Sequence, residues 1–260
     1  MKDDKNRNLL LTEERREQIL NTLQRDGRVL AIDLSRTLGV SDDTIRRDLD
    51  ALAETGLLRR VHGGALRSTP INENYNARQG EATAAKQSIA RATAALIRPG
   101  QVVILDGGTT SLAVAQNLPS DLEVTIVTTS PPVAVALAAY PSIEVLTIGG
   151  KLYRYAMVAV GAYTVEALRE IRADVCILGI LALHSEVGIS VLDREEAAVK
   201  QAMIAAAADI LAPTTADKLG TIAPFIVSPP SALTHLITEN GVSEETLAPY
   251  RSSGITVIQA

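Results

Sequence analysis

The chain has 260 residues, 47% of them hydrophobic, and its formal net charge is −5. A chain of this length and composition can bury enough apolar surface for one large domain or two smaller ones. Its apolar runs fall short of the roughly 18 to 20 uncharged residues of a membrane-spanning helix, so no such helix is expected.

The cysteine and histidine content restricts the chemistry further. The single cysteine, Cys176, lies within an apolar run, so it forms no intrachain disulfide and is expected in the core. His62, His184 and His235 are scattered and form no metal-ligand motif. The first residues are too charged for a signal peptide. We therefore expect a cytoplasmic protein with no metal and no cofactor.

Charge is distributed unevenly along the chain. Residues 1–67 hold 13 Lys and Arg against 12 Asp and Glu, a net charge of +1, which leaves 12 against 18, net −6, for the remainder. The negative charge of the whole chain therefore does not exclude a nucleic-acid partner for its first quarter.

Three short helices are predicted at the N-terminus. The first lies in the segment 12–27, with Thr12 as its cap and Gly27 as its stop. The second lies in the segment 31–39 and ends at Gly39. Short turns connect these helices to each other and to a third.

The third helix, SDDTIRRDLDAL, begins with a Ser41 cap. On a helical wheel Ile45, Leu49 and Leu52 form one apolar stripe. Arg47 points away from this stripe, and Arg46 lies to its side. One interpretation is that these arginines are solvated partners of nearby aspartates, such as Asp42 or Asp50 for Arg46. The alternative is that they contact a ligand.

A β-hairpin is predicted directly after the third helix. Leu57 to Val61 form a β-prone stretch, and Gly63 and Gly64 follow as a turn. A hairpin in this position is the wing of a winged helix-turn-helix, whose third helix enters the major groove of DNA. There an arginine bonds guanine or a phosphate, and the wing contacts the backbone.

The predicted DNA contacts lie on the third helix and on the wing. They are Ser41, Thr44, Arg46, Arg47, Arg59, Arg60 and His62. Asp43 and Asp50 share the exposed face of the helix and repel phosphate, so contact depends on arginine and hydroxyl groups. Asp48 lies nearer the buried side, where we expect it to pair with an arginine of the wing.

The N-terminal pattern resembles a known family. Arg15, Ile19 and Leu23, the run Ser41 to Leu49, and RRVHGGA match the signature of the DeoR/GlpR family of bacterial transcription regulators. The resemblance implies a winged helix-turn-helix that binds operator DNA, usually as a repressor, under the control of a C-terminal sensor domain.

A change of composition marks the end of this region. Polar and turn-forming residues interrupt the apolar pattern, which places a linker at 67–78 between a DNA-binding domain at 1–66 and a second domain at 79–260. In the second domain strands alternate with helices, including a long helix over 193–211, which predicts one α/β domain with a mainly parallel sheet.

The first strand of this sheet ends in DGGTT, where ligands of α/β sheets bind. Gly107 and Gly108 allow close approach of a ligand, and Thr109 and Thr110 donate hydroxyls. An anion such as phosphate is expected at the helix start. Asp106 is expected to accept hydrogen bonds from sugar hydroxyls. Thr129 and Ser130 end the next strand and add hydroxyls to the same crevice. A structural turn with a capping threonine is the alternative explanation.

Two lysines are candidate partners of the anion. Lys200 lies in an alanine-rich helix, and its structural alternative is an i,i+4 pair with Glu196. Lys218 lies in a glycine-terminated loop, where a solvated lysine is the alternative. The family resemblance extends through LDGGTTSLAVA, IGGKL, EEAAVK and DKLG, although Thr129 stands where the family commonly has Asn. It implies a sensor domain similar to ribose-5-phosphate isomerase that recognises phosphorylated sugars or related metabolites.

Two classes of function follow. The first is a DNA-binding regulator that represses a carbohydrate-metabolism operon under the control of a phosphorylated sugar or a related metabolite. The alternative is a sugar-phosphate isomerase with an accessory helical domain, for which Asp106 or Glu196 is the available base. The sequence favours the regulator and assigns no catalytic residue, because it has no paired carboxylate motif. Operator half-sites are symmetric, so a homo-oligomer, a dimer or tetramer, is expected.

Overall fold

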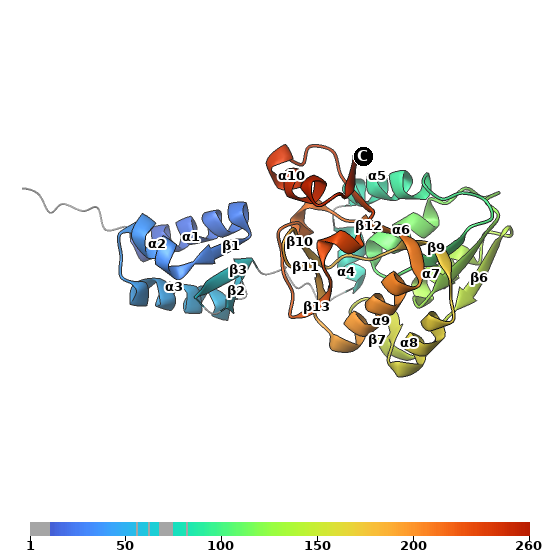
Figure 1. The fold of residues 1–260 in the computed structure, drawn as a ribbon, viewed down its shortest axis with the longest axis horizontal. Coiled ribbons are helices and arrows are strands. Elements are labelled where there is room, and N and C mark those ends of the chain that lie inside the picture. The colour runs from blue at the N-terminus through green and yellow to red at the C-terminus, as the bar shows by residue number, and fades with distance from the viewer. Residues whose placement is uncertain (1–10, 56, 62, 68–74, 82) are drawn as a thin grey trace, which may run out of the picture. The chain divides into compact units, whose positions relative to one another are not determined.

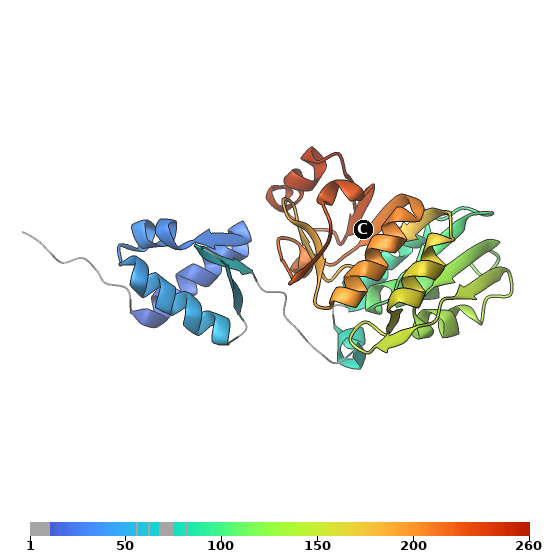
Figure 2. The same cartoon turned by 60° about the horizontal axis from the view of Figure 1, so that its bottom comes forward.

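The computed structural model describes residues 11–55, 57–61, 63–67, 75–81 and 83–260. The chain forms two compact units, Met1–Pro70 and Ile71–Ala260. Figures 1 and 2 show a small helical unit with a short sheet and a larger unit built on an extended sheet. Within the described residues, no helix has both the length and the apolar character needed to cross a membrane.

The N-terminal unit is a winged helix-turn-helix. It contains helices α1 (Thr12–Asp26), α2 (Ala31–Leu38) and α3 (Asp42–Glu54), and strands β1 (Arg28–Leu30), β2 (Leu58–Val61) and β3 (Gly64–Arg67). The strands form an antiparallel sheet in the order β1-β3-β2. Ile19, Ile45 and Leu49 are fully buried between the helices, as the apolar stripe of α3 predicts.

The helix ends follow from local sequence, with one correction. Gly27 and Gly39 end α1 and α2 in the left-handed conformation, at φ 70° and 66°, as predicted. Thr12 is not the cap of α1. Leu11 is the N-cap residue, and its backbone N–H donates to the Glu14 carboxylate at 3.1 Å, which satisfies one N–H group at the start of the helix.

Strand β1 is absent from the sequence-based prediction. It pairs with β3 across the hairpin, and Leu30 lies opposite Gly64. A Cβ atom on Gly64 would lie 2.0 Å from the carbonyl oxygen of Val29, so glycine is required there by the close approach of β1. Gly63, at φ 81°, supplies the turn.

The C-terminal unit is built on a parallel seven-stranded sheet. Its order is β15-β14-β12-β9-β4-β5-β6. The strands are β4 (Val102–Leu105), β5 (Val124–Thr128), β6 (Ile143–Thr147), β9 (Ala173–Ile177), β12 (Ala207–Pro213), β14 (His235–Thr238) and β15 (Thr256–Gln259). Cys176 is fully buried in β9, as expected.

Helices cover both faces of this sheet, which confirms the predicted α/β class. One face packs against α5 (Thr83–Ala94), α6 (Thr109–Gln116) and α7 (Pro131–Leu137). The other packs against α8 (Ala162–Arg169), α9 (Arg194–Ala205) and α10 (Glu244–Ser252). Figure 2 shows α8 and α9 side by side on their face.

The predicted helix over 193–211 is too long. Helix α9 ends at Ala205, and Ala207–Pro213 form β12 between β9 and β14. The run of alanines reads as helix locally, but Ile210, Leu211 and Ala212 are buried against opposite faces of the sheet. Because the residues of this segment are buried on both faces of the sheet, the segment forms a strand and not the end of a helix.

Several small elements complete the unit and were not predicted. A two-stranded sheet contains β7 (Lys151–Tyr153) and β8 (Val158–Val160), and a three-stranded sheet contains β10 (Ala182–His184), β11 (Gly188–Val191) and β13 (Phe225–Ser228). Two short 3₁₀ turns, η1 (Ala216–Lys218) and η2 (Pro230–Ala232), follow β12 and β13.

The predicted linker, 67–78, includes regular structure at both described ends. Arg67 is the last residue of β3, and Tyr75–Gly80 form helix α4. Residues 68–74 lie outside the described residues. The domain limits 1–66 and 79–260 therefore stay predictions, while α4 places the first described element after this segment within the C-terminal unit.

Candidate nucleic-acid interface and candidate effector site

Arg46 and Arg47 are both exposed on α3, on the side away from the core. Arg46 lies 3.8 Å from the Asp43 carboxylate, and both side chains are more than 60% exposed. Within the described residues, neither of the expected partners, Asp42 and Asp50, forms an ion pair with Arg46, and Asp50 pairs with Arg60. An exposed pair at this separation contributes less than about 1 kcal/mol, so both guanidinium groups are available to a ligand.

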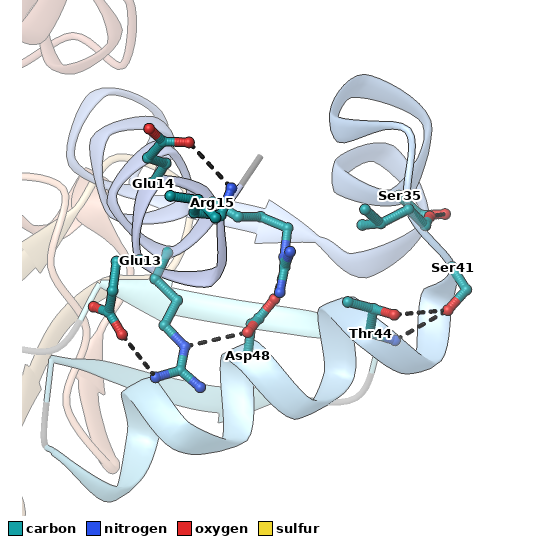
Figure 3. A network of polar contacts seen from close by, with 10 residues as sticks. Glu13, Glu14, Arg15, Ser35, Ser41, Thr44 and Asp48 are labelled. Atoms are coloured by element: carbon teal, nitrogen blue, oxygen red, sulfur yellow. Dashed lines mark hydrogen bonds and ion pairs between the residues drawn. The ribbon is translucent and has the colours of Figure 1, made fainter. Parts of the chain in front are cut away.

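The first turn of α3 is held by its cap, as Figure 3 shows. The Ser41 hydroxyl accepts from the Thr44 backbone N–H at 3.2 Å and lies 2.9 Å from the Thr44 hydroxyl. This confirms the predicted cap. The two hydroxyls stabilise the turn from which a winged helix approaches DNA, and each keeps further hydrogen-bonding capacity.

Asp48 does not pair with the wing, which corrects the sequence-based expectation. It is buried, and its carboxylate accepts from Arg15 Nε at 2.5 Å and from Arg16 Nε at 3.2 Å (Figure 3). Both arginines belong to α1. The pair of arginines compensates a charge that would be costly to bury alone, and it fixes α1 against the recognition helix.

The wing is tied to α3 by another residue. Arg60 donates to the Asp50 carboxylate and to the carbonyl of Gly64, each at 2.7 Å. It therefore braces the hairpin on the helix before any DNA contact. Arg59 on β2 is half-buried, and His62 lies outside the described residues.

The residues predicted to bind an anion lie in the loop after β4 and at the start of α6. Helix α6 begins at Thr109 with Gly108 as its N-cap at φ 99°. A Cβ on Gly108 would meet nothing within 4 Å, whereas one on Gly107 would lie 2.1 Å from a Val158 methyl carbon. The two glycines therefore have different roles: the space at Gly107 is filled by the protein, and that at Gly108 is open to a ligand.

Asp106 and Lys200 form a buried ion pair, so the structure brings together two residues expected to contact the effector separately. The Lys200 ammonium donates to the Asp106 carboxylate and to the carbonyl of Gly179 at 2.8 Å. Asp106 also accepts from the backbone N–H groups of Gly107 at 2.7 Å and Gly179 at 3.0 Å. Burial lowers the pKa of Lys200, but the Asp106 and Glu196 carboxylates outweigh it and raise the pKa, which keeps the lysine charged.

Glu196 lies beside this pair on α9. Its carboxylate is 3.8 Å from the Lys200 ammonium, so the structural alternative of an i,i+4 pair is present but secondary to Asp106. Burial raises the pKa of Glu196 to about 7 against the opposing charge of Lys200. Within the described residues, its Oε2 atom has no hydrogen-bond partner.

Three buried hydroxyls in the same region have no hydrogen-bond partner among the described residues. They belong to Thr110, Ser111 and Thr129. A buried hydroxyl left unpaired is destabilising by about 1–3 kcal/mol, which favours a bound polar group here. Ser130 differs, because its hydroxyl donates to the carbonyl of Met157 at 3.0 Å.

Unlike Lys200, Lys218 forms no ion pair with a carboxylate within the described part of the chain. It ends η1 and is half-buried. Burial lowers its pKa to about 8, opposed by Asp217 and assisted by the positive charges of Lys86, Arg78 and Lys200.

Arg78 and Lys86 were missed by the sequence reasoning. Arg78 lies in α4, within the predicted linker, and Lys86 lies in α5, which was not predicted. The spacing of Ile89, Ala90 and Thr93 on the buried side of α5 is the sequence signal that could have revealed this helix and the lysine one turn earlier.

Two family models match the chain. A DeoR-like helix-turn-helix domain matches residues 15–70, and a DeoR C terminal sensor domain matches residues 81–240. A putative aga operon transcriptional repressor of Escherichia coli O157:H7 is 33% identical over 251 residues, 95% of this chain and 93% of that protein. The glycerol-3-phosphate regulon repressor of Escherichia coli K12 is 34% identical over 192 residues, 74% of this chain and 76% of that protein.

Solved structures show similarity at a lower level. Ribose 5-phosphate isomerase A of Methanocaldococcus jannaschii covers 49% of this chain and 50% of its own, at 15% identity and a TM-score of 0.35. The sorbitol operon regulator SorC of Klebsiella pneumoniae covers 81% and 91%, at 12% identity and a TM-score of 0.37. Nothing about function follows from similarity at this level.

Proposed function

The chain belongs to the DeoR family of transcription regulators, and from this premise we propose that it represses an operon of carbohydrate metabolism under the control of a phosphorylated sugar or a related metabolite. The observation that carries the proposal is the combination of two features in one chain. The N-terminal unit has two exposed arginines on a capped helix, α3, beside a wing, and the separate α/β unit has a helix, α6, whose N-terminus is open.

The DNA-binding half rests on α3 and the hairpin. Arg46 and Arg47 contact base edges or phosphates in the major groove, while Ser41 and Thr44 contact the backbone at the helix start. The wing adds backbone contacts through Arg59, Arg60 and His62. Because Arg60 is already bonded to Asp50 and Gly64, its main contribution is to hold the wing in position.

The sensor half rests on the loop after β4. The N–H groups of Gly108, Thr109 and Thr110 at the start of α6 bind the phosphate, since an α-helix N-terminus favours an anion. The hydroxyls of Thr110 and Thr129 have no partner among the described residues and add hydrogen bonds. One relative is named for a glycerol-3-phosphate regulon, which supports a small phosphorylated polyol or sugar as the class of effector.

A homo-oligomer completes the proposal. One recognition helix reads a few base pairs, so two half-sites require at least a dimer. The exposed apolar side chains of Val135, Leu146 and Leu152, near the edge strand β6, support a second copy of the chain at this surface. A dimer or a tetramer satisfies this requirement.

Asp106, the first candidate base for an isomerase, is not available as a proton acceptor. Asp106 accepts three hydrogen bonds, including one from Lys200, and is therefore held as a structural anion instead of a proton acceptor. The chain belongs to a family of regulators, which favours the regulator over the enzyme.

The test is a DNA-binding titration with the DNA upstream of the protein's own gene. We expect a specific complex whose affinity is at least 1000-fold above that for unrelated DNA, and whose release follows addition of one member of a panel of sugar phosphates. The same panel in a thermal-shift assay should show about 2.7 kcal/mol of stabilisation at 100 times the dissociation constant. Equal affinity for both DNAs would contradict the proposed regulator function. Turnover of any sugar phosphate would support the isomerase function instead.

A further inference from the structure

Helix α7 has an exposed side without polar residues. Its other side packs on the sheet through Val133 and Leu137, which are fully buried. Val135 between them is 75% exposed. The other exposed residues of the helix and of its C-terminal end are apolar as well: Pro131, Ala138 and Ala139. A surface helix normally has polar residues on the side away from the core, so α7 is typical of a helix that a further surface covers.

The sequence around α7 is almost free of charge. Between Glu123 and Lys151 it has one charged residue, Glu144, although 21% of the whole chain is charged. The Glu144 carboxylate accepts a hydrogen bond from the Thr125 hydroxyl at 3.0 Å. Depletion of charged residues distinguishes the centre of a protein interface from the rest of a surface. The exposed part of this segment therefore has the composition of an interface.

The edge of the large sheet lies beside this helix. Strand β6 is the last in the sheet order, packs against α7 and, within the described residues, pairs with β5 on one side only (Figure 1). Leu146 on this strand is 44% exposed. Lysine, proline or a bulge normally protects an edge strand, whereas β6 contains neither residue and keeps a regular register with β5. Its outer N–H and C=O groups are available to a strand of another molecule.

Val135 forms a ridge between two hollows. One hollow, of about 450 Å³, lies between α7 and the ends of β5 and β6, and its walls include Ile148 and Leu152. The other lies between α6 and α7, and its walls include Leu112 and Met157. Val135 lines both hollows. A ridge beside a hollow can fit the same two features on a second copy that is related by a twofold axis.

We propose that a second copy of this chain docks on this surface, here called the α7–β6 face and defined by the exposed residues Pro131, Val135, Ala138, Ala139, Leu146 and Leu152. A twofold axis brings the same face of each copy together, with Val135 of each copy entering a hollow of the other. The inference rests on the proposed function, which requires a dimer, and deepens it by naming the residues through which the sensor units associate.

A second copy fits the α7–β6 face better than a partner of different composition. A charged partner would bury its charges without an opposite charge on this face, which is costly. The same face of another copy is equally apolar and uncharged. In addition, a twofold axis at the edge of a sheet reverses the strand direction, so β6 of each copy can pair antiparallel with β6 of the other and continue the sheet.

Thr129 connects the α7–β6 face with the candidate effector site. It lines the same hollow as Leu152, and its buried hydroxyl has no hydrogen-bond partner within the described residues. Its carbonyl accepts from the Ala159 N–H, another group at this hollow, at 2.8 Å. A ligand bound to the Thr129 hydroxyl is therefore adjacent to the docking surface. We expect the effector and the second copy to affect each other's binding.

Sedimentation velocity of the full-length protein over a range of concentrations tests the α7–β6 face. Val135→Glu should raise the dissociation constant of self-association about 100-fold or more, because it buries an unpaired charge in the interface. Ile226→Glu is the matched control, since Ile226 is a 46% exposed apolar residue of β13, in the separate three-stranded sheet. It should leave association within about twofold. Circular dichroism should show the same fold for both variants.

A mixing experiment separates a lost contact from a damaged fold. Val135→Glu and Val135→Lys should each dissociate alone, because a twofold interface places two like charges on one contact surface. An equimolar mixture should associate about tenfold or more tightly than either variant alone, since opposite charges then meet across the interface. If each variant is folded and the mixture stays dissociated, the face does not bind its own copy and the proposal is wrong.

The connection through Thr129 is measured with the sugar phosphate that stabilises the protein most in the thermal-shift panel. At saturation it should change the association constant of the parent about fivefold or more, and Thr129→Val should reduce that change. An association constant that does not respond to this ligand would overturn the connection and leave the docking face standing.

Operator binding separates the inference from the function on which it rests. Loss of the dimer should weaken binding of Val135→Glu to a two-half-site operator about 100-fold. If the parent binds the operator specifically and Val135→Glu matches Ile226→Glu in association and in DNA affinity, the inference is wrong while the function stands. A monomeric parent that binds the operator has the same meaning. If the parent neither associates nor binds the operator, both the inference and the function are wrong.

Discussion

Arg46 and Arg47 are neighbours on α3, but their surroundings differ. Arg46 has a weak exposed partner in Asp43, whereas Arg47 forms no hydrogen bond or ion pair within the described residues. A side chain with no role in the fold can be removed without a structural effect. A substitution of Arg47 therefore tests its contact with DNA separately from its effect on folding.

We expect Arg47→Ala to weaken operator binding by about 1–3 kcal/mol while the thermal stability of the protein stays unchanged. Fluorescence anisotropy over a series of salt concentrations measures both the affinity and the number of phosphates neutralised. Arg169→Ala, an exposed arginine of α8, is the matched control. An unchanged affinity and salt slope for Arg47→Ala would show that α3 does not dock as proposed.

Glu196 gives a second prediction at this scale. Its pKa is about 7 in the folded protein and 4.5 in the unfolded chain, so between these values the folded state binds more protons. Stability therefore falls as pH rises from about 4.5 to about 7, by at most about 3 kcal/mol, and is constant above that range. Glu196→Gln should remove this slope and raise stability at pH 8. Denaturant titrations at pH 5, 6, 7 and 8 measure it, and a parallel slope in both proteins would contradict it.

At the scale of elements, the wing depends on a contact that no single segment contains. Strand β1 lies between α1 and α2 in the sequence, yet it pairs with β3 and completes the sheet behind the hairpin. Gly64 permits this pairing because its missing side chain leaves room for the Val29 carbonyl. The hairpin is therefore fixed on two sides, by β1 and by the bond from Arg60 to Asp50.

Gly64→Ala should accordingly destabilise the N-terminal unit by more than Gly63→Ala. The first substitution places a methyl group 2.0 Å from a backbone oxygen and displaces β1, whereas the second meets open space and adds only the strain of φ 81°. That strain is about 1 kcal/mol. Chemical denaturation followed by circular dichroism compares the two. If Gly63→Ala lowered the free energy of unfolding more than Gly64→Ala, the pairing of β1 with β3 would not be the reason that position 64 requires glycine.

At the scale of the whole molecule, sensing and DNA binding belong to two compact units of one chain. An effector bound at α6 alters DNA affinity only if it binds the two states of the protein with different free energies. Coupling of this kind is a property of the equilibrium and acts equally in both directions.

Reciprocity gives a quantitative expectation. If a sugar phosphate lowers operator affinity tenfold, operator DNA must lower the affinity for that sugar phosphate tenfold, about 1.4 kcal/mol in each direction. Calorimetry of the effector with and without bound DNA measures the second factor. Thr109→Val should reduce the response and leave effector-free DNA binding intact. Unequal factors in the two directions would show that the effector binds at more than one site or changes the oligomer.

Local sequence determined the parts of this protein that local physics controls. The apolar spacing in α3, the Ser41 cap and the glycine stops after α1 and α2 were predictable because each depends on residues within one or two turns. The alternation of apolar strands with amphipathic helices likewise indicated the α/β class and the DGGTT turn at a strand end. The family signature covers these same local patterns.

The tertiary structure decided which distant residues meet. Asp48 pairs with α1 and not with the wing, and Lys200 pairs with Asp106, because burial of a carboxylate selects whichever cation the packing brings within reach. The alanine-rich end of the predicted helix over 193–211 became β12, since burial between two strands outweighed helix propensity. Arg78, placed in the linker by composition, lies beside Tyr155, 77 positions later in the sequence, because α4 packs on α6. Such long-range contacts have no local pattern, and they set the charge balance of the candidate effector site.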